Sequence, residues 1–581
     1  MRKALEIRKT FSGDNLAQYV ALTWFRYHTQ RFPKIQQWKE LRNYVFATDT
    51  TTTTNRTLPW KNSTTVPKLC QIRDNLHSNY VSALFPNDEW IKWEAYSLED
   101  ALKVKAVAIK SYMSNKTREN HFRTEVSKLL YDYIDYGNAF ATVDYESSFI
   151  VNANGEKVPR FIGPRVVRIS PMDIVFNPLA SSFKDSFKII RKLINRSELY
   201  RMAEESPDNM WLKSAIVNRE KMLKHMQAYG IEEADKAEGF LMDGFGNYSE
   251  YLGSDYVEML TFYGDVFNAD TNELQKGQQI TVIDRMWVIN QKPFDSWFGD
   301  APIYHVGWRF RPDNLWAMGP LDNLVGMQYR LDHLENMKAD ASDLAVHPPL
   351  VIKGEVEKFE WGPGVEIHVD ENGDVQELAR NVQWVIQADN QIERLEQKME
   401  MFAGAPREAM GMRTAGEKTA FEVQQLQNAA SRIFQEKITN FEIEMLEKLL
   451  NAMLEVSRRN LDVEDVIRVT DDDLGVTTFM SITKDDITAS GKLRPIGARH
   501  FAAQAQIVQN LTNLANTPIW QQIAPHISNK QLAKMVEDVL NLDRFALFSP
   551  NVALFEQQET QRVGSQLAED LDVEATNMPL E

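Results

Sequence analysis

Two segments with helical periodicity are separated by the stretch Gly404-Ala405-Pro406-Arg407-Glu408-Ala409-Met410-Gly411-Met412-Arg413-Thr414-Ala415-Gly416-Glu417-Lys418-Thr419. Glycine and proline both weaken a helix, and this stretch holds three glycines and one proline. Neither residue type occurs in 391–402 before it or in 419–459 after it. The sequence therefore predicts a helix, a loop and a second, much longer helix.

The long helix carries one apolar stripe on the 3.6-residue period. Its members are mostly three or four residues apart: Val423, Leu426, Ala430, Ile433, Ile438, Phe441, Met445, Leu449, Met453 and Val456. At about 1.5 Å per residue, 419–459 would span roughly 60 Å. Helices of this length usually cross a domain, line a bundle or join subunits, so the element indicates assembly rather than a catalytic pocket.

The size and charge of the chain limit its function. A chain of 581 residues is too long for one core, and we expect two to four domains or one multi-lobed body. Acidic residues exceed basic ones, 82 to 65, which argues against a tight clamp on nucleic acid because phosphates need facing cations. An acidic protein can still surround DNA without gripping it.

The cysteine content and the hydropathy pattern restrict the compartment. Cys70 is the one cysteine, which excludes an intramolecular disulfide and a cysteine-based zinc cluster and fits a reducing environment. The start, Met1 to Lys9, is basic but leads to no apolar segment, so we expect no signal peptide. No stretch approaches the roughly 20 uncharged residues that span a bilayer, so we expect no membrane partner.

The first 140 residues are expected to be mainly helical. Residues 14–46 form one periodic segment with a break at Pro33, and further helices are predicted at 66–85 and, as a pair, within 98–136. Between them, the threonine-rich stretch 48–57 favours an exposed loop, with an arm that reaches a neighbouring subunit as the alternative.

Strands follow at Gly137, where the helical pattern ends. The pair Asn154-Gly155 between two β-rich runs is a hairpin signal, and 165–169 reads as a strand. Residues 196–231 are again helical. Strands within 256–290 lack a ten-residue helix between them, so the sequence predicts an antiparallel sheet.

The most informative pattern is a small β insertion between two helices. The elements expected in order are a helix at 319–345, strands at 350–352, 365–369 and 375–378 with a turn at Asn372-Gly373, and a helix at 389–402. A pair of helices with a small sheet at its tip makes a stalk with a knob. A small β region is expected at 462–490, then helices at 499–515 and 529–540 and an acidic tail at 556–581.

Sites for enzyme chemistry are not indicated. The run Gly411 to Thr419 approaches a phosphate loop, but Glu417 stands between the second glycine and the lysine, where it displaces the lysine and repels anions. The ten histidines are scattered, and the run Asp471 to Asp473 is typical of a solvated turn. We therefore expect no catalytic residues, no metal and no cofactor, and a protein that is not an enzyme.

Contact with nucleic acid is the remaining candidate. Arg407, Arg413 and Lys418 lie in the glycine-bearing stretch with Met410 and Met412 between them. A few cations on a loop of an acidic protein suit loose contact with phosphates, independent of base sequence. The alternative, pairing of these cations with neighbouring carboxylates such as Glu408 and Glu417, stays open on the residues alone.

Several motifs resemble the portal, or head-to-tail connector, proteins of tailed double-stranded DNA bacteriophages, most of all those of short-tailed phages. The central one runs from Ala405 to Val423 and continues as Ala429-Ala430-Ser431-Arg432-Ile433-Phe434-Gln435. Tyr136-Gly137-Asn138-Ala139-Phe140, Ser170-Pro171-Met172-Asp173 and the segment 491–501 support it in the expected order.

The resemblance implies a mainly helical α+β subunit of a ring, usually of twelve copies, with four named parts. The implied ranges are wing 1–318, stem helix 319–345, clip 346–388, stem helix 389–403, tunnel-loop region 404–418, long helix and returning wing 419–490, crown 491–555 and an acidic tail 556–581. The short remainder after 491 makes a long C-terminal helical barrel unexpected.

The same resemblance implies site residues and partners. Arg407, Met410, Met412, Arg413 and Lys418 become tunnel-loop candidates; Asp389, Glu393, Glu396 and Glu400 become acidic residues lining the channel; Trp361, Val365, Ile367, Asn372 and Gly373 become clip candidates. The implied partners are double-stranded DNA, a terminase motor, major capsid and scaffolding proteins and a tail adaptor. The implied location is the portal vertex of the virion, after assembly in the host cytoplasm.

Two rival functions belong to other classes. An ATP-dependent motor is disfavoured by the broken phosphate loop. An internal virion or scaffold-type helical protein would form filaments or small oligomers and gives the β insertion no role.

Overall fold

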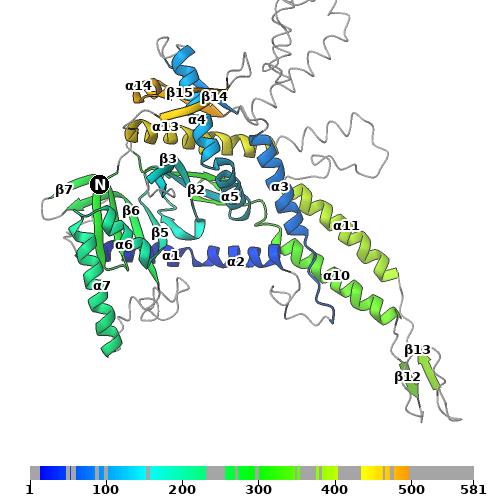
Figure 1. Ribbon diagram of the computed structural model, residues 1–581. Helices are drawn as coiled ribbons and strands as arrows, with labels where there is room; N and C mark the ends of the chain where they lie inside the picture. The colour runs from blue at the N-terminus through cyan, green and yellow to red at the C-terminus, as the bar shows by residue number, and fades with distance from the viewer. Residues whose placement is uncertain are drawn as a thin grey trace, which may run out of the picture.

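The computed structural model describes residues 14–47, 53, 56, 61–85, 90–96, 103–151, 157–229, 255–268, 272–294, 300–346, 350–353, 374–377, 383–403, 433–461, 465–470 and 477–495. The structure is 54% helical and 29% strand, and this mixture confirms the expected α+β class. Figure 1 shows a body of helices and sheets from which two helices project side by side.

Two helices, α1 (Asp14–Gln30) and α2 (Phe32–Phe46), lie end to end along one border of the body (Figure 1). The break between them falls at Arg31, two residues before the expected Pro33. Proline fits the first turn of α2 because the N–H that it lacks has no helical partner there. The apolar face of α1 is buried, with Val20 and Trp24 packed on a sheet.

Three more helices match the expected N-terminal pattern: α3 (Lys68–Leu84), α4 (Lys103–Glu119) and α5 (Phe122–Asp135). Helices α3 and α5 share the largest hydrophobic core with the helical segment 433–460.

A three-stranded antiparallel sheet continues from α5. Its strands are β2 (Asn138–Val151), β3 (Lys157–Ile169) and β9 (Ile303–Gly307), in the order β3-β2-β9. The pairing of Val151 with Lys157 confirms the hairpin that Asn154-Gly155 predicted. A 3-10 turn, η3 (Pro171–Asp173), then leads to the next sheet.

The second sheet is antiparallel, as expected, with five strands in sequence order. They are β4 (Ile174–Phe176), β5 (Lys188–Asn195), β6 (Tyr256–Asn268), β7 (Glu273–Ile283) and β8 (Trp287–Pro293). Helices α6 (Arg196–Glu205) and α7 (Met210–Tyr229) pack on it, with Leu199 and Leu212 among the buried contacts.

The turn between β7 and β8 runs from Asp284 to Met286, inside the range 256–290 in which strands were expected. Asp284 and Arg285 both have positive φ, of 49° and 60°. Their side chains are buried in ion pairs, Asp284 with Arg219 at 2.7 Å and Arg285 with Glu258 at 2.7 Å. These pairs hold a turn conformation that glycine or asparagine usually supplies.

The long helix is confirmed over its described part. Residues 433–441 are helical, a π-helical stretch covers Glu442–Glu447, and α13 is Lys448–Asn460. The described stripe members from Ile438 to Val456 are buried, whereas Ile433 is exposed. The earlier part of the predicted helix, 419–432, lies outside the described residues.

Three small antiparallel pairs complete the body. They are β1 (Ile91–Ala95) with β16 (Gly491–Pro495), β10 (Arg309–Arg311) with β11 (Asn314–Met318), and β14 (Asp465–Thr470) with β15 (Thr477–Ile482), which α14 (Lys484–Ile487) follows. The β14–β15 pair agrees with the β region expected at 462–490, whereas β16 lies just after that range. The rest of 491–555 and the acidic tail lie outside the described residues.

Candidate functional site: a helical stalk and its root

The two projecting helices are α10 (Val325–Val346) and α11 (Gln383–Ala403), and we call them the stalk. They lie side by side, and the Lys338 ammonium on α10 is 2.9 Å from the Asp389 carboxylate on α11. At their outer end β12 (Leu350–Lys353) pairs antiparallel with β13 (Asp374–Glu377) (Figure 1). The expected order of helix, β insertion and helix is confirmed, although α10 begins six residues later than 319 and α11 six residues earlier than 389.

A segment of the N-terminal part, residues 61–66, runs along α10, and we call it the strap. Four side chains of α10, each four residues from the next, bond its backbone: Gln328, Asp332, Asn336 and Asp340. The Asn336 amide bonds Thr64 twice, accepting from its N–H at 2.8 Å and donating to its carbonyl at 2.7 Å.

The strap bonds continue at both ends. Gln328 donates to the carbonyl of Val66 at 2.7 Å, and Asp332 accepts from its N–H at 2.9 Å. Asp340 accepts from the N–H groups of Lys61 and Asn62 at 3.1 and 2.9 Å. Burial raises the pKa of the Asp340 carboxyl, but these bonds outweigh burial and hold the pKa below its ordinary value.

Helix α11 is tied to the body by a buried ion pair. The Lys68 ammonium at the start of α3 lies 2.6 Å from the Glu400 carboxylate, and both side chains are about 5% exposed or less. Glu396, one turn earlier, is 3.7 Å from the same ammonium. Because removal of one member would leave a buried charge, the pair fixes the inner end of α11 on α3.

The stalk joins the body through a glycine contact. Gly137 has a φ of +69°, and a side chain there would place Cβ 2.3 Å from the backbone nitrogen of Gly319, just ahead of α10. Only glycine lets the two backbones approach so closely. This contact gives a structural reason for Gly137 in the Tyr136 to Phe140 motif.

The next residue of that motif, Asn138, completes the joint. Its amide donates to the carbonyl of Ala317 and accepts from the N–H of the same residue, both at 3.0 Å. His305 Nε2 lies 3.1 Å from Asn138 Oδ1. Burial lowers the pKa of His305 to about 3, so the neutral ring donates this bond.

The Ser170 to Asp173 motif is likewise structural. The Arg31 guanidinium, between α1 and α2, donates to the carbonyls of Pro171, Met172 and Ile174 at 2.6 to 2.8 Å. The same group lies 4.8 Å from the centre of the Trp316 ring. The motif therefore fixes the α1–α2 junction on the second sheet.

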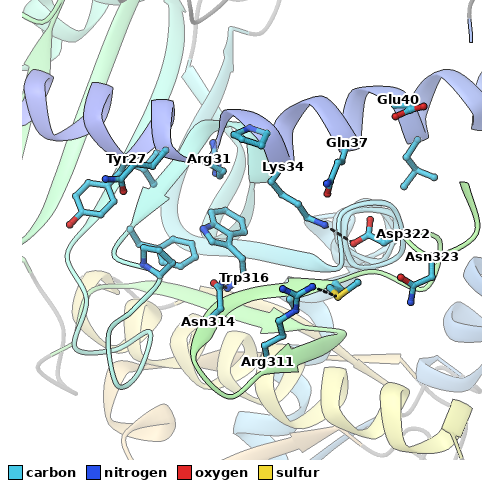
Figure 2. A pocket seen from close by; sticks show the side chains of 18 of the residues that line it. Tyr27, Arg31, Lys34, Gln37, Glu40, Arg311, Asn314, Trp316, Asp322 and Asn323 are labelled. Atoms are coloured by element: carbon cyan, nitrogen blue, oxygen red, sulfur yellow. Dashed lines mark hydrogen bonds and ion pairs between the residues drawn. The ribbon is translucent and has the colours of Figure 1, made fainter. Parts of the chain in front are cut away.

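A cavity of about 640 Å³ lies at the root of the stalk, between α2, the β10–β11 hairpin and the start of α10 (Figure 2). On one side Lys34 reaches from α2 to Asp322, with 2.7 Å between ammonium and carboxylate. On the other, Arg311 extends from β10 and donates to the Met318 sulfur at 3.4 Å. We call this space the root cavity.

The four acidic candidates for a channel lining are all on α11 but face different surroundings. Asp389 and Glu393 are exposed, and Asp389 is bound to Lys338. Glu396 is half-buried and Glu400 is buried, both beside Lys68. The channel-lining role stays a prediction, and the structure adds that Glu400 is enclosed by contacts within this chain.

The other predicted site residues lie outside the described residues. These are the tunnel-loop candidates Arg407, Met410, Met412, Arg413 and Lys418, and the clip candidates Trp361, Val365, Ile367, Asn372 and Gly373. Both groups stay predictions.

Sequence reasoning missed the strap and the root cavity. The signal for the strap was present, because the polar residues Gln328, Asp332, Asn336 and Asp340 repeat every four residues within the helix predicted at 319–345. The root cavity has no such signal, since its lining comes from the end of α1, from α2, β4, β10 and β11, and from the start of α10.

The described ranges show neither a metal-binding group nor a membrane-spanning helix. They contain no group of three or more His, Cys, Asp and Glu side chains placed to hold a metal ion. Within the same ranges, every helix is too short or too polar to cross a membrane.

Comparison with protein-family models gave no match, and comparison with curated proteins gave none either.

Proposed function

We propose that this chain is a portal subunit, which forms a ring at one capsid vertex and serves as the channel for genome packaging and ejection. The observation that supports the proposal best is the stalk, in which α10, the β12–β13 pair and α11 follow one another and a long helix comes later. This order fits the stem, clip, stem and returning wing that the sequence motifs imply.

The surface of the stalk supports assembly into a ring. Six large apolar side chains on its two helices are exposed in the single chain: Tyr329, Met337, Val346, Ile386, Met401 and Phe402. Exposed apolar groups on a projecting pair of helices favour burial against another protein surface. In a ring of copies, neighbouring stalks would supply that surface.

The charge of the chain supports a conduit rather than a clamp. The formal net charge is −17, although the exposed positions of α11 carry Arg394 and Lys398 as well as Asp389 and Glu393. Carboxylates repel phosphates, so such a channel would let DNA slide without holding it.

In this proposal the body is the wing, α10 and α11 are the stem, and the β12–β13 pair belongs to the clip. The crown would begin with β16, which pairs with β1. The ring would be the platform for a terminase motor and a tail adaptor and would sit among major capsid and scaffolding proteins. It would assemble in the host cytoplasm and remain at the portal vertex of the virion.

The test is the mass of the purified chain by light scattering, with negative-stain images of the same peak. Twelve chains of 67.0 kDa have a combined mass of about 804 kDa. We expect closed rings with a central hole near that mass. Filaments or a small closed oligomer would contradict the proposal and favour an internal virion or scaffold-type protein.

A charge variant makes the test specific to the stalk. We expect Met337→Glu combined with Ile386→Glu to reduce ring formation, because both side chains are exposed on the stalk and a buried interface would exclude the new charges. The matched control is Leu22→Glu, which adds a charge at an exposed apolar position on α1, far from the stalk in sequence.

A further inference from the structure

The root cavity has the lining of a site for an extended peptide. Four primary amides face it, from Gln30, Gln37, Asn314 and Asn323. Primary amides can both donate to and accept from a peptide backbone. The strap shows this mode within the same chain, because Asn336 bonds both backbone groups of Thr64.

One wall of the cavity is apolar and can take aliphatic side chains. Trp316 stacks on Phe176 with ring centres 4.5 Å apart, and Pro178 and Met318 extend the same wall. A peptide that alternates polar and apolar residues would therefore find both kinds of contact.

The cavity lining carries three cations, Arg31, Lys34 and Arg311, against two carboxylates, Glu40 and Asp322, so its net charge favours an acidic occupant. The Lys34 ammonium is already bound to Asp322. Arg311 is exposed, and in the described part of the chain no carboxylate lies within 4 Å of its guanidinium. An incoming carboxylate would meet this guanidinium, whose fork of donors matches it.

We propose that the root cavity binds an extended segment of the chain's own acidic C-terminal residues, 556–581. These hold seven acidic residues and one basic residue, with Leu567 and Leu571 as apolar anchors. The last described residue before them is Pro495, and residues 496–555 lie between. At most about 3.3 Å per residue, that length can reach the other side of the body.

The experiment places a photoreactive phenylalanine analogue at Gln37 in the full-length chain and maps the cross-links by mass spectrometry. We expect cross-links to 556–581. The matched control carries the same group at Gln36, which is exposed on α2 but does not line the cavity. It should give no cross-link to that segment.

Two substitutions test the charge contact. Arg311→Glu should lower the cross-link yield about tenfold, and Arg311→Lys should retain most of it. The residue is exposed, so neither change should disturb folding. Cross-links from Gln37 to any other segment, no cross-link, or a yield unaffected by Arg311→Glu would each overturn the proposal.

This inference does not rest on the proposed ring. Light scattering of the same samples separates the two ideas, because rings without a tail cross-link would overturn only the cavity proposal. A tail cross-link in a chain that forms filaments would overturn only the ring.

Discussion

Two helices of this chain differ in what holds them: α10 also buries Leu331 in the largest core, but of the two it alone is bonded along its length to a neighbouring segment in the described part of the chain. Helix α1 packs on the second sheet through apolar side chains such as Val20 and Trp24. Helix α10 is bound to the strap by polar side chains at every fourth residue. Apolar contact is tolerant of small shifts because it has no direction, whereas hydrogen bonds fix distance and angle. The difference suggests that α1 supplies stability and the strap supplies the register of the stalk.

The largest effect should come from Trp24→Ala on the apolar side. Trp24 is fully buried between α1 and the sheet, so its loss leaves a large cavity. We expect the free energy of unfolding of this region to fall by about 3–5 kcal/mol, measured by urea denaturation followed by far-UV circular dichroism.

The control for this prediction is Leu22→Ala on the same helix. Leu22 is 56% exposed, and its truncation should change the free energy by less than about 0.5 kcal/mol. Equal effects of the two changes would show that α1 does not pack on the sheet as described.

Asn336→Leu should break the strap with a smaller and more local effect. Asn336 is fully buried, and the change leaves the N–H and carbonyl of Thr64 without their partners. We expect a loss of about 2–3 kcal/mol in the stability of the strap, seen as faster hydrogen exchange of residues 61–66.

Met337→Leu is the matched control, since Met337 is the next residue and is 49% exposed. Exchange at 61–66 should then match the unchanged protein. If Asn336→Leu accelerated exchange in the second sheet as strongly as in the strap, the two regions would not be separate.

The smallest effect should be a pH dependence at the outer end of the strap. The pKa of Asp340 is held below its ordinary value, so the unfolded strap binds a proton more readily. Stability from this carboxylate is therefore present above about pH 4 and lost as the pH falls through the lower folded pKa.

Asp340→Asn should remove that acid-linked loss and cost about 0.5–1 kcal/mol at neutral pH, because the amide oxygen still accepts one bond. Protection factors of Lys61 and Asn62 amides between pH 3 and pH 6 measure it. A pH dependence that persists in Asp340→Asn would assign the effect to another group.

The elements that could be predicted are those that depend on a repeated spacing of residues within one short segment. The apolar repeat from Ile438 to Val456, the hairpin at Asn154-Gly155 and the β insertion between two helices follow from spacing that a single segment displays. Their approximate positions were right, and the helix ends moved by up to six residues.

The missed features depend on partners distant in sequence. The hydrogen bonds that Asn336 and Asp340 make to the strap cannot be predicted from α10 alone, because their partners are in residues 61–66. The turn at Asp284 and Arg285 has positive φ without the usual asparagine or glycine. Ion pairs to Arg219 and Glu258, which are distant in sequence, offset the backbone strain. The root cavity gathers residues separated by nearly 300 positions.

The backbone contact between Gly137 and Gly319 has a mechanical consequence. It brings the two ends of residues 138–318 together, and the Asn138 amide bonds Ala317 across this joint, so part of a tension on α10 would pass to the end of α5 through these bonds. A pull along the stalk would therefore act on the body at two places, the joint at Gly137 and Asn138 and the Lys68–Glu400 pair on α3.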